Sequence, residues 1–200
     1  QITTGWTLVL NSLDIHQETT LNQGTSSVFN KLIKQVKGGI APDLATTMPE
    51  TPDPSTINFT IHQGVKFHDK DPVNGREMTT DDVLYSMERI RTDDPAFQNK
   101  RFLSNVESIV APDSSTISMT TAFPFAPQVT FLAAPYMVVV PPEAVEAGGG
   151  DLKQGPLIGT GPFMSEVADR SVQYIVKANP DYFVDGRPFA DGGRVQQFTE

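Results

Sequence analysis

Clusters of proline and glycine interrupt this chain repeatedly and limit how long any helix or strand in it can be. Four prolines fall between Pro42 and Pro54, three glycines stand together at 148–150, and a mixed cluster occupies 155–163. Proline cannot donate a backbone hydrogen bond, and glycine destabilises the interior of both helices and strands. Each cluster therefore marks a break between short elements of secondary structure.

Alternating apolar and polar residues predict strands on both sides of these breaks. Ile57, Phe59 and Ile61 alternate with polar residues, as in a strand with one buried face. The pair Gln63-Gly64 then allows a turn into a short apolar segment at 65–67. Further strands are predicted at 6–10, 106–110, 116–120, 137–140 and 172–176.

Helical spacing of apolar residues is clearest over 80–91, where Val83, Met87 and Ile90 share one face. Aspartates near the start and arginines near the end match the helix dipole. A second helix is predicted over 25–36, with a serine to cap it and the glycines at 38–39 to end it. Short helices are also expected at 127–134 and 141–147, the latter opened by prolines.

Two ten-residue segments repeat one turn and one strand: TPDPSTINFT at 51–60 and APDSSTISMT at 111–120. Reuse of favourable turn chemistry and an internal duplication both explain the repeat. Either origin predicts strands, and 106–110 can pair with 116–120 as a hairpin. Because strands and helices are interspersed without a regular β-α-β repeat, the predicted fold class is α+β.

Charge and composition argue against several classes of protein. The formal net charge is -9 and no basic run occurs, so the phosphates of a nucleic acid would be repelled. Cysteine is absent, which removes disulfides and thiolate sites. The longest apolar stretch, 131–140, contains Pro135 and is far shorter than the ~20 residues of a membrane span. No basic and apolar leader precedes Trp6, so we expect either a cytosolic protein or a targeting segment outside this sequence.

Patterns for catalysis or metal binding are weak. The segment 69–75 resembles a calcium loop, but Val73 occupies a ligand position and the glycine falls one residue late. His62 and His68 flank a turn and could meet at a metal, although such histidines are more often half-exposed strand residues. The cluster 155–163 lacks the Lys-Ser/Thr of a phosphate loop. Composition allows a glycosidase-like carboxylate pair, but no spacing favours one. We expect no catalytic residue, metal or cofactor.

Several segments resemble, in order, the motifs of the family 5 extracellular solute-binding proteins, which capture peptides for ABC importers. They are GIAPDLA at 39–45, INFTIHQGVKFHD at 57–69, MTTDDVLYS at 78–86, GTGPF at 159–163 and NPDYF at 179–183. Each motif is weak by itself, but an ordered series rarely arises by accident. The sequence departs from the family at Ile15, where a proline is usual, and at Phe183, where a tryptophan is usual. The turn after Asp69 is also lengthened.

The resemblance implies the N-terminal part of a two-lobed periplasmic-binding-protein fold (type II, cluster C-like) with an inserted small α/β subdomain. It places the start of the first lobe at 1–42, the insertion at 43–157 and the return into the first lobe at 158–200. The second lobe would lie outside this sequence, so strand edges of the first lobe are expected to be exposed and to self-associate.

The implied function is capture of a peptide or similar small solute and its delivery to ABC permease subunits, without covalent chemistry. The implied location is extracytoplasmic, either periplasmic or lipid-anchored on the outer face of the cell membrane. Two alternatives remain open: a cargo other than a peptide, such as a sugar or a metal chelate, and a secreted hydrolase.

The resemblance also implies ligand contacts, for each of which a structural role is the alternative. Glu18, in the loop after the Leu-Asp pair, could bind an ammonium group or could be a solvated loop residue. Phe97 and Phe102 could offer an aromatic ring to the cleft or belong to the core. Thr160 and Gly161 lie at the return crossing, where a tight turn near the hinge is the alternative. The candidates are His16, Gln17, Glu18, Thr19, Phe97, Phe102, Thr160 and Gly161.

Overall fold

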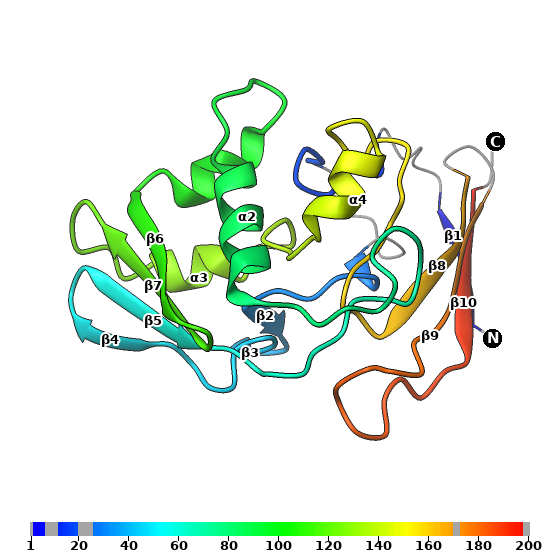
Figure 1. Cartoon of the computed structure of the whole chain (residues 1–200), viewed down its shortest axis with the longest axis horizontal. Coiled ribbons are helices and arrows are strands. Elements are labelled where there is room, and N and C mark those ends of the chain that lie inside the picture. Colours follow the sequence, from blue (N-terminus) through cyan, green and yellow to red (C-terminus); the bar gives the residue numbers. More distant parts are fainter. Residues whose placement is uncertain (1, 7–11, 20–25, 170–172, 198–200) are drawn as a thin grey trace.

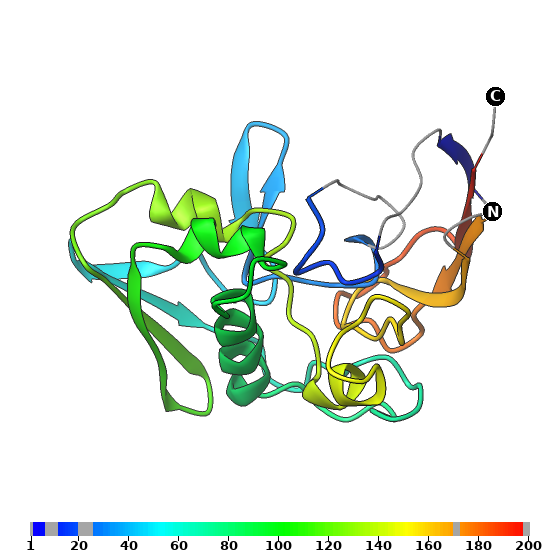
Figure 2. The same cartoon turned by 90° about the horizontal axis from the view of Figure 1, so that it is seen from above.

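A computed structural model describes residues 2–6, 12–19, 26–169 and 173–197. Two four-stranded sheets lie at opposite ends of the molecule, with helices between them and a separate hairpin near the middle (Figures 1 and 2). The sheets have the strand orders β1-β10-β9-β8, β4-β5-β7-β6 and β2-β3. The strands are β1 (Ile2–Trp6), β2 (Ile33–Val36), β3 (Gly39–Pro42), β4 (Glu50–Asp53), β5 (Thr56–Thr60), β6 (Val106–Asp113), β7 (Thr116–Thr121), β8 (Phe163–Asp169), β9 (Gln173–Ala178) and β10 (Gly192–Gln197). The helices are α2 (Thr80–Ile90), the 3-10 helix η1 (Gln98–Leu103), α3 (Gln128–Leu132) and α4 (Pro142–Ala147).

The repeated segments form the same hairpin twice, which confirms both predicted strands. Asp53 and Asp113 each accept a backbone N–H from the serine two residues later, at 2.8 Å in both turns. The antiparallel register of β5 and β7 pairs Asn58 with Ser118, which hold the same position in the two repeats. A local two-fold axis therefore relates hairpin β4–β5 to hairpin β6–β7.

The predicted helices at 80–91, 127–134 and 141–147 are confirmed as α2, α3 and α4. The N-terminus of α2 is held by Asp82, whose carboxylate accepts the N–H of Thr79 at 2.8 Å and two donors of the Arg76 guanidinium. Arg76 also donates to Glu143 near the start of α4. One arginine thus fixes two helix starts against each other, which the local sequence pattern does not reveal.

The helix predicted over 25–36 is wrong. Residues Ile33–Val36 form β2, which pairs with β3, and Gly38 adopts a φ of 92° in the turn between them. The preceding Val28 and Leu32 are almost fully buried on a stretch that passes through the core. Apolar residues there are buried on more than one side, so their spacing does not mark a single helical face. Moreover, β-branched residues favour the strand.

Two other predicted strands need correction. The stretch 137–140 forms only an isolated bridge, between Val138 and Lys31, and the carbonyl oxygen of Val138 accepts from the His16 ring rather than from a neighbouring strand. The strand predicted at 6–10 falls outside the described residues except for Trp6, which ends β1. The strand predicted at 172–176 is observed as β9 from Gln173 onward.

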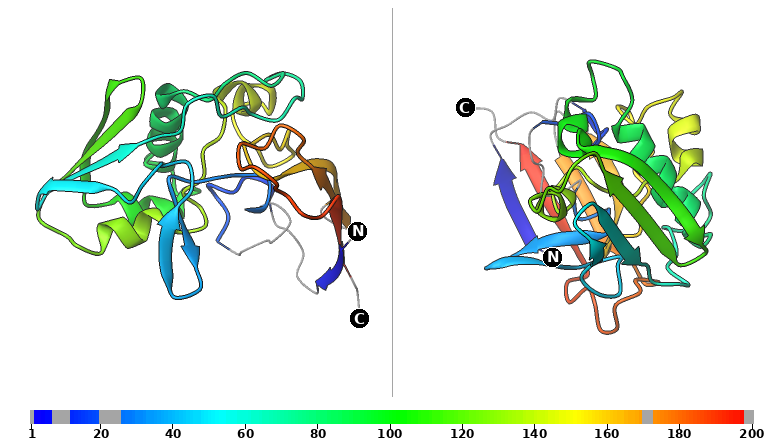
Figure 3. Two further views of the ribbon diagram at one scale, coloured as in Figure 1. Left: turned by 90° about the horizontal axis from the view of Figure 1, so that it is seen from below. Right: turned by 90° about the vertical axis from the view of Figure 1, so that its left-hand side faces the viewer.

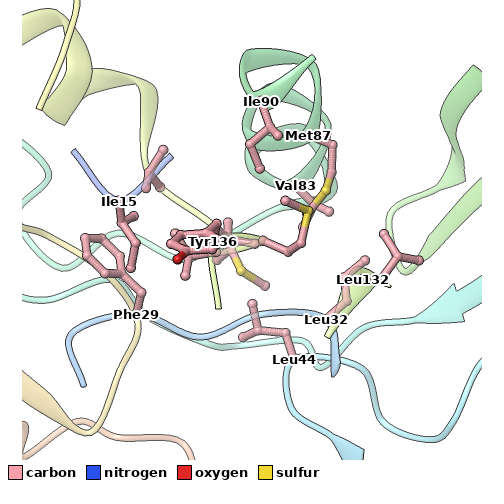
Figure 4. Packing of buried hydrophobic residues seen from close by; sticks show 14 of the residues in the cluster. Ile15, Phe29, Leu32, Leu44, Val83, Met87, Ile90, Leu132 and Tyr136 are labelled. Carbon is pink, nitrogen blue, oxygen red and sulfur yellow. The ribbon is translucent and has the colours of Figure 1, made fainter. Parts of the chain in front are cut away.

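One continuous apolar core joins residues that lie far apart in the chain. Ile15 and Phe29 come from the first part, Leu44, Met87 and many others from the middle, and Tyr174 from β9. Figure 4 shows Ile15 and Phe29 beside Tyr136, with the buried face of α2 above them. Among the described residues, no helix has the length and apolar character needed to cross a membrane.

Candidate functional site

The loop at 12–19 is fixed by a buried ion pair to helix α2. The Arg89 guanidinium donates to Asp14 through Nη2, at 2.5 Å, and through Nη1, at 3.0 Å. The Asp14 side chain is fully buried and also accepts the N–H of Leu152 at 3.1 Å. Burial raises the pKa of Asp14, but the hydrogen bonds and charge of Arg89 outweigh it and leave that pKa below its usual value. This carboxylate therefore ties the loop to two distant segments.

His16 is held as a neutral imidazole by contacts on both ring nitrogens. Nδ1 lies 3.0 Å from Arg89 Nη1, and Nε2 lies 3.0 Å from the carbonyl oxygen of Val138. Arginine only donates, so Nδ1 accepts and Nε2 carries the proton. Burial, together with the charge of Arg89, lowers the pKa of His16 to about 4. Its side chain is 0% exposed and anchors the loop to Arg89 and Val138.

The backbone of the same loop is clamped while its last side chains remain accessible. Asn99 donates through Nδ2 to the carbonyl oxygens of His16, at 3.0 Å, and Glu18, at 2.7 Å. The hydroxyl of Tyr136 donates to the carbonyl oxygen of Thr19 at 2.8 Å. Gln17 and Glu18 are half-buried, and Thr19 is exposed. The loop thus presents polar groups from a rigid support.

The two candidate phenylalanines lie beside this support. The ring of Phe97 packs against Arg89, whose guanidinium carbon is 5.0 Å from the ring centroid. Phe102 stacks on Tyr136, with 6.4 Å between the centroids and 25° between the ring planes. Phe97 is only 7% exposed, whereas Phe102 is half-buried. Six of the candidates therefore share one neighbourhood around Arg89 and Tyr136.

Thr160 and Gly161 lie at the crossing where the chain passes Val28 and Asn30. Thr160 donates to Asn30 Oδ1 at 3.1 Å, and the N–H of Gly161 donates to the carbonyl oxygen of Val28 at 2.8 Å. A Cβ on Gly161 would come within 2.4 Å of the Val28 carbonyl carbon. Thr160 thus joins the crossing segments through side chains, and Gly161 joins them through the backbone. The segment 138–139 connects this crossing to the loop, because Val138 bonds to His16 and the N–H of Val139 to Asn30.

The residues that organise the loop were missed by sequence reasoning. Arg89 matched the dipole of its helix, and nothing in the local pattern indicates that it pairs with Asp14, 75 residues earlier. Asn99 and Tyr136 likewise act on carbonyl oxygens 83 and 117 residues away in the chain. An arginine on the apolar side of a helix is the one signal that could have suggested a buried ion pair.

The histidine pair does not form a metal site. His68 is buried, and its Nε2 donates to the carbonyl oxygen of Gly161 at 2.9 Å. His62 instead packs against Phe183, with ring centroids 5.4 Å apart. Within the described part of the chain, no group of three or more potential ligands from histidine, cysteine, aspartate and glutamate could hold a metal ion.

With this geometry in place, comparison with known proteins identifies the family. Residues 39–200 match the family model described as bacterial extracellular solute-binding proteins, family 5, middle region. The chain belongs to this family. Among curated relatives of this family 5 chain, di/tripeptide-binding protein 1 of Pseudomonas aeruginosa is 29% identical over 184 residues, which is 82% of this chain and 34% of the relative. The glutathione-binding protein GsiB of Salmonella typhi is 28% identical over 139 residues, covering 70% of this chain and 26% of the relative.

Solved structures support the same fold. The periplasmic binding protein DppA of Helicobacter pylori, in complex with the peptide STSA, superposes with a TM-score of 0.85 over 98% of this chain and 42% of its own, at 22% identity. AgaA of Agrobacterium tumefaciens R10, in complex with agropinic acid, gives 0.82 at 29% identity over 98% of this chain and 39% of its own. This family 5 chain therefore has part of the two-lobed, mixed α/β fold of periplasmic binding proteins, as expected. It spans about a third of the curated relatives it matches.

Proposed function

We propose that the protein is the solute-binding component of an ABC importer, capturing peptides or similar small solutes outside the cytoplasm and passing them to permease subunits. Membership of family 5 is the observation that carries this proposal. Relatives named for di/tripeptides and for glutathione favour peptides as the cargo. The protein would be periplasmic or anchored to the outer face of the membrane, and would carry out no covalent chemistry.

The loop at 16–19 is proposed to meet the solute. Glu18 is the group suited to an ammonium of the ligand, because a carboxylate and an ammonium form strong charge-assisted hydrogen bonds. Thr19 adds accessible polar atoms, and Phe102 adds an aromatic surface beside them. The buried pair Asp14–Arg89 holds this surface before any ligand arrives, which lowers the entropic cost of binding.

The remaining candidates are proposed to act through position. His16 supports the loop through its ring nitrogens, and Phe97 covers Arg89. Thr160 and Gly161 fix the crossing against Asn30 and Val28. We retain the division into 1–42, 43–157 and 158–200 as a proposal, in which Thr160 and Gly161 lie just after the second boundary. Self-association is proposed to use β1 and β8, which are the edge strands of their sheet.

Titration of trialanine into the isotope-labelled chain, followed by amide NMR shifts, tests the proposal. One face of a closing cleft supplies only part of the contacts, so weak binding, with a Kd of roughly millimolar, is expected. The shifts should centre on 16–19 and Phe102. Phe102→Ala should weaken binding, while Phe123→Ala should not, because it removes a 57% exposed ring that reaches Phe102 only through Phe125 and Phe131.

N-acetylated trialanine separates the role of Glu18 from general stickiness. The acetylated peptide lacks the ammonium, so it should bind the unaltered chain more weakly and bind the variant Glu18→Gln no differently from the free peptide. Equal binding of both peptides to the unaltered chain, or shifts remote from 16–19, would refute the assigned contacts.

A cargo other than a peptide is the second candidate. AgaA, whose structure contains agropinic acid, is as similar in sequence to this chain as the di/tripeptide-binding relative, at 29% identity in both cases. Substituting an opine for trialanine in the same titration distinguishes the two, because only the true class of cargo should shift 16–19 at the lower concentration.

A further inference from the structure

A pocket of about 570 Å³ lies between the β2–β3 hairpin, the start of β8 and the loop that joins β9 to β10. Figure 1 shows the β9–β10 loop at the lower edge of the molecule, whereas the loop at 12–19 lies near the upper edge beside α4. The hairpin and the β9–β10 loop also lie near each other in the view from below (Figure 3, left). The pocket is therefore separate from the proposed solute contacts.

Apolar and aromatic groups form most of its walls. Phe163, Val184 and Phe189 line it together with three other apolar residues. The side chain of Phe189 is 80% exposed and Val184 is 38% exposed, so both offer apolar surface to a ligand. Tyr182 also lines the pocket, and its hydroxyl lies 3.4 Å from Asn30 Nδ2. The volume and lining are typical of sites for small organic molecules.

Both charged groups that line this pocket are cations. The Arg187 guanidinium lies over the ring of Phe189, 3.8 Å from its centroid, and among the described residues no carboxylate pairs with it. Lys34 Nζ donates to Asp43 at 2.9 Å, which leaves two of its three donors for another acceptor. Lys31 lies close enough to Asp43 and Lys34 for their charges to affect its pKa, which burial lowers.

Local charge favours an anion despite the negative charge of the whole chain. The carboxylate named so far near the pocket is that of Asp43. It is paired with Lys34 and also lies close to the positive charge of Lys31. Asp185, next to Val184, is exposed and does not line the pocket. A carboxylate entering between Lys34 and Arg187 would therefore meet two cationic donors, of which Lys34 is shared with Asp43.

From these observations we infer a second binding site, for a small organic acid whose carboxylate lies between Lys34 and Arg187 and whose apolar body packs against Phe163, Val184 and Phe189. The site is independent of the proposed solute contacts. The same chemistry is also found at the C-terminus of an apolar peptide, so a free peptide terminus is the other possible source of the carboxylate.

Three matched probes test the charge requirement: 4-phenylbutyrate, 4-phenylbutanamide and 4-phenylbutylamine. Amide NMR titrations of the chain should show shifts at Lys34 and 182–189 for the carboxylate, with the amide weaker and the amine weakest. Arg187→Met keeps an unbranched apolar stem but removes the guanidinium, and should weaken binding of 4-phenylbutyrate about tenfold while changing the amide little. Phe189→Ala should weaken both probes.

Arg101→Met is the control, because Arg101 also lies over a phenylalanine, Phe102, at 4.9 Å, but away from this pocket. It should leave binding of 4-phenylbutyrate unchanged. The peptide acetyl-Ala-Ala-Phe, with a free or an amidated C-terminus, separates the two sources: tighter binding of the free acid than of 4-phenylbutyrate assigns the site to peptide termini. Equal binding of carboxylate and amine, insensitivity to Arg187→Met, or absence of shifts at 182–189 would overturn the inference.

Discussion

Replacing Arg89 by methionine tests whether the buried ion pair with Asp14 holds the loop at 12–19 in place. The side chains of Arg89 and Asp14 are 7% and 0% exposed, so the substitution leaves a carboxylate in a site that water does not reach. With charge centres ~4 Å apart and an effective dielectric constant of ~20, the lost attraction is about 4 kcal/mol. Breaking buried pairs in other proteins costs about 3–5 kcal/mol, which agrees.

Urea unfolding followed by circular dichroism gives the measurement. The free energy of unfolding should fall by about 4 kcal/mol, which is a large part of the ~5–15 kcal/mol typical of a folded chain. Because the altered protein can then be partly unfolded, a second variant is needed. Asp14→Asn combined with Arg89→Met removes both charges and should recover part of the loss, since no uncompensated ion remains buried.

Lys153→Met is the matched control. Lys153 pairs with Asp151 at 3.3 Å, but both side chains are at least one third exposed, so its removal should cost less than about 1 kcal/mol. If Arg89→Met cost no more than this control, or if the double variant were less stable than Arg89→Met, the buried pair would not be what fixes the loop.

Three further predictions concern the crossing, the histidines and the domain boundaries. Burial lowers the pKa values of His16 and His68 to about 4, so between pH ~6.5 and ~4 the unfolded state binds protons that the folded state does not. Stability should therefore decrease by up to about 3 kcal/mol per histidine as the pH is lowered through this window. In His68→Gln, the urea midpoint should depend less steeply on pH than in the unaltered protein. Gly161→Ala should destabilise the chain by ~1–3 kcal/mol in the same assay, more than Gly149→Ala, where nothing lies within 4 Å of the added Cβ and only the positive φ of 80° opposes the alanine; a smaller cost at Gly161 than at Gly149 would contradict the close packing of the crossing. Limited proteolysis should cut first in 38–54 or 148–156, and early cleavage within α2 would count against the proposed boundaries.

Local patterns predicted the elements whose surroundings are simple. Helix α2 has one face on the core and one in water, so its apolar spacing matches its structure. The hairpins of the β4-β5-β7-β6 sheet follow from turn chemistry within a few residues. By contrast, the stretch before β2 is buried on several sides, and the glycines at 38–39 form a hairpin turn rather than a helix end. Spacing alone could not separate these cases.

The candidate site was predictable only in outline. The resemblance indicated the loop at 16–19 and the two phenylalanines, and the structure brings them together around Arg89 and Tyr136. It could not indicate that His16 is buried with both ring nitrogens engaged. Such contacts join residues far apart in the chain, and short-range periodicity contains no information about them.

Native mass spectrometry of the protein isolated from its own cells without denaturation tests the central claim most directly. A solute-binding protein should carry a small bound molecule that is released unchanged on unfolding, and its mass should identify a peptide or another cargo. Release of a cleaved product, with turnover of added peptide that is lost when one carboxylate is replaced, would instead show a hydrolase and contradict the proposed function.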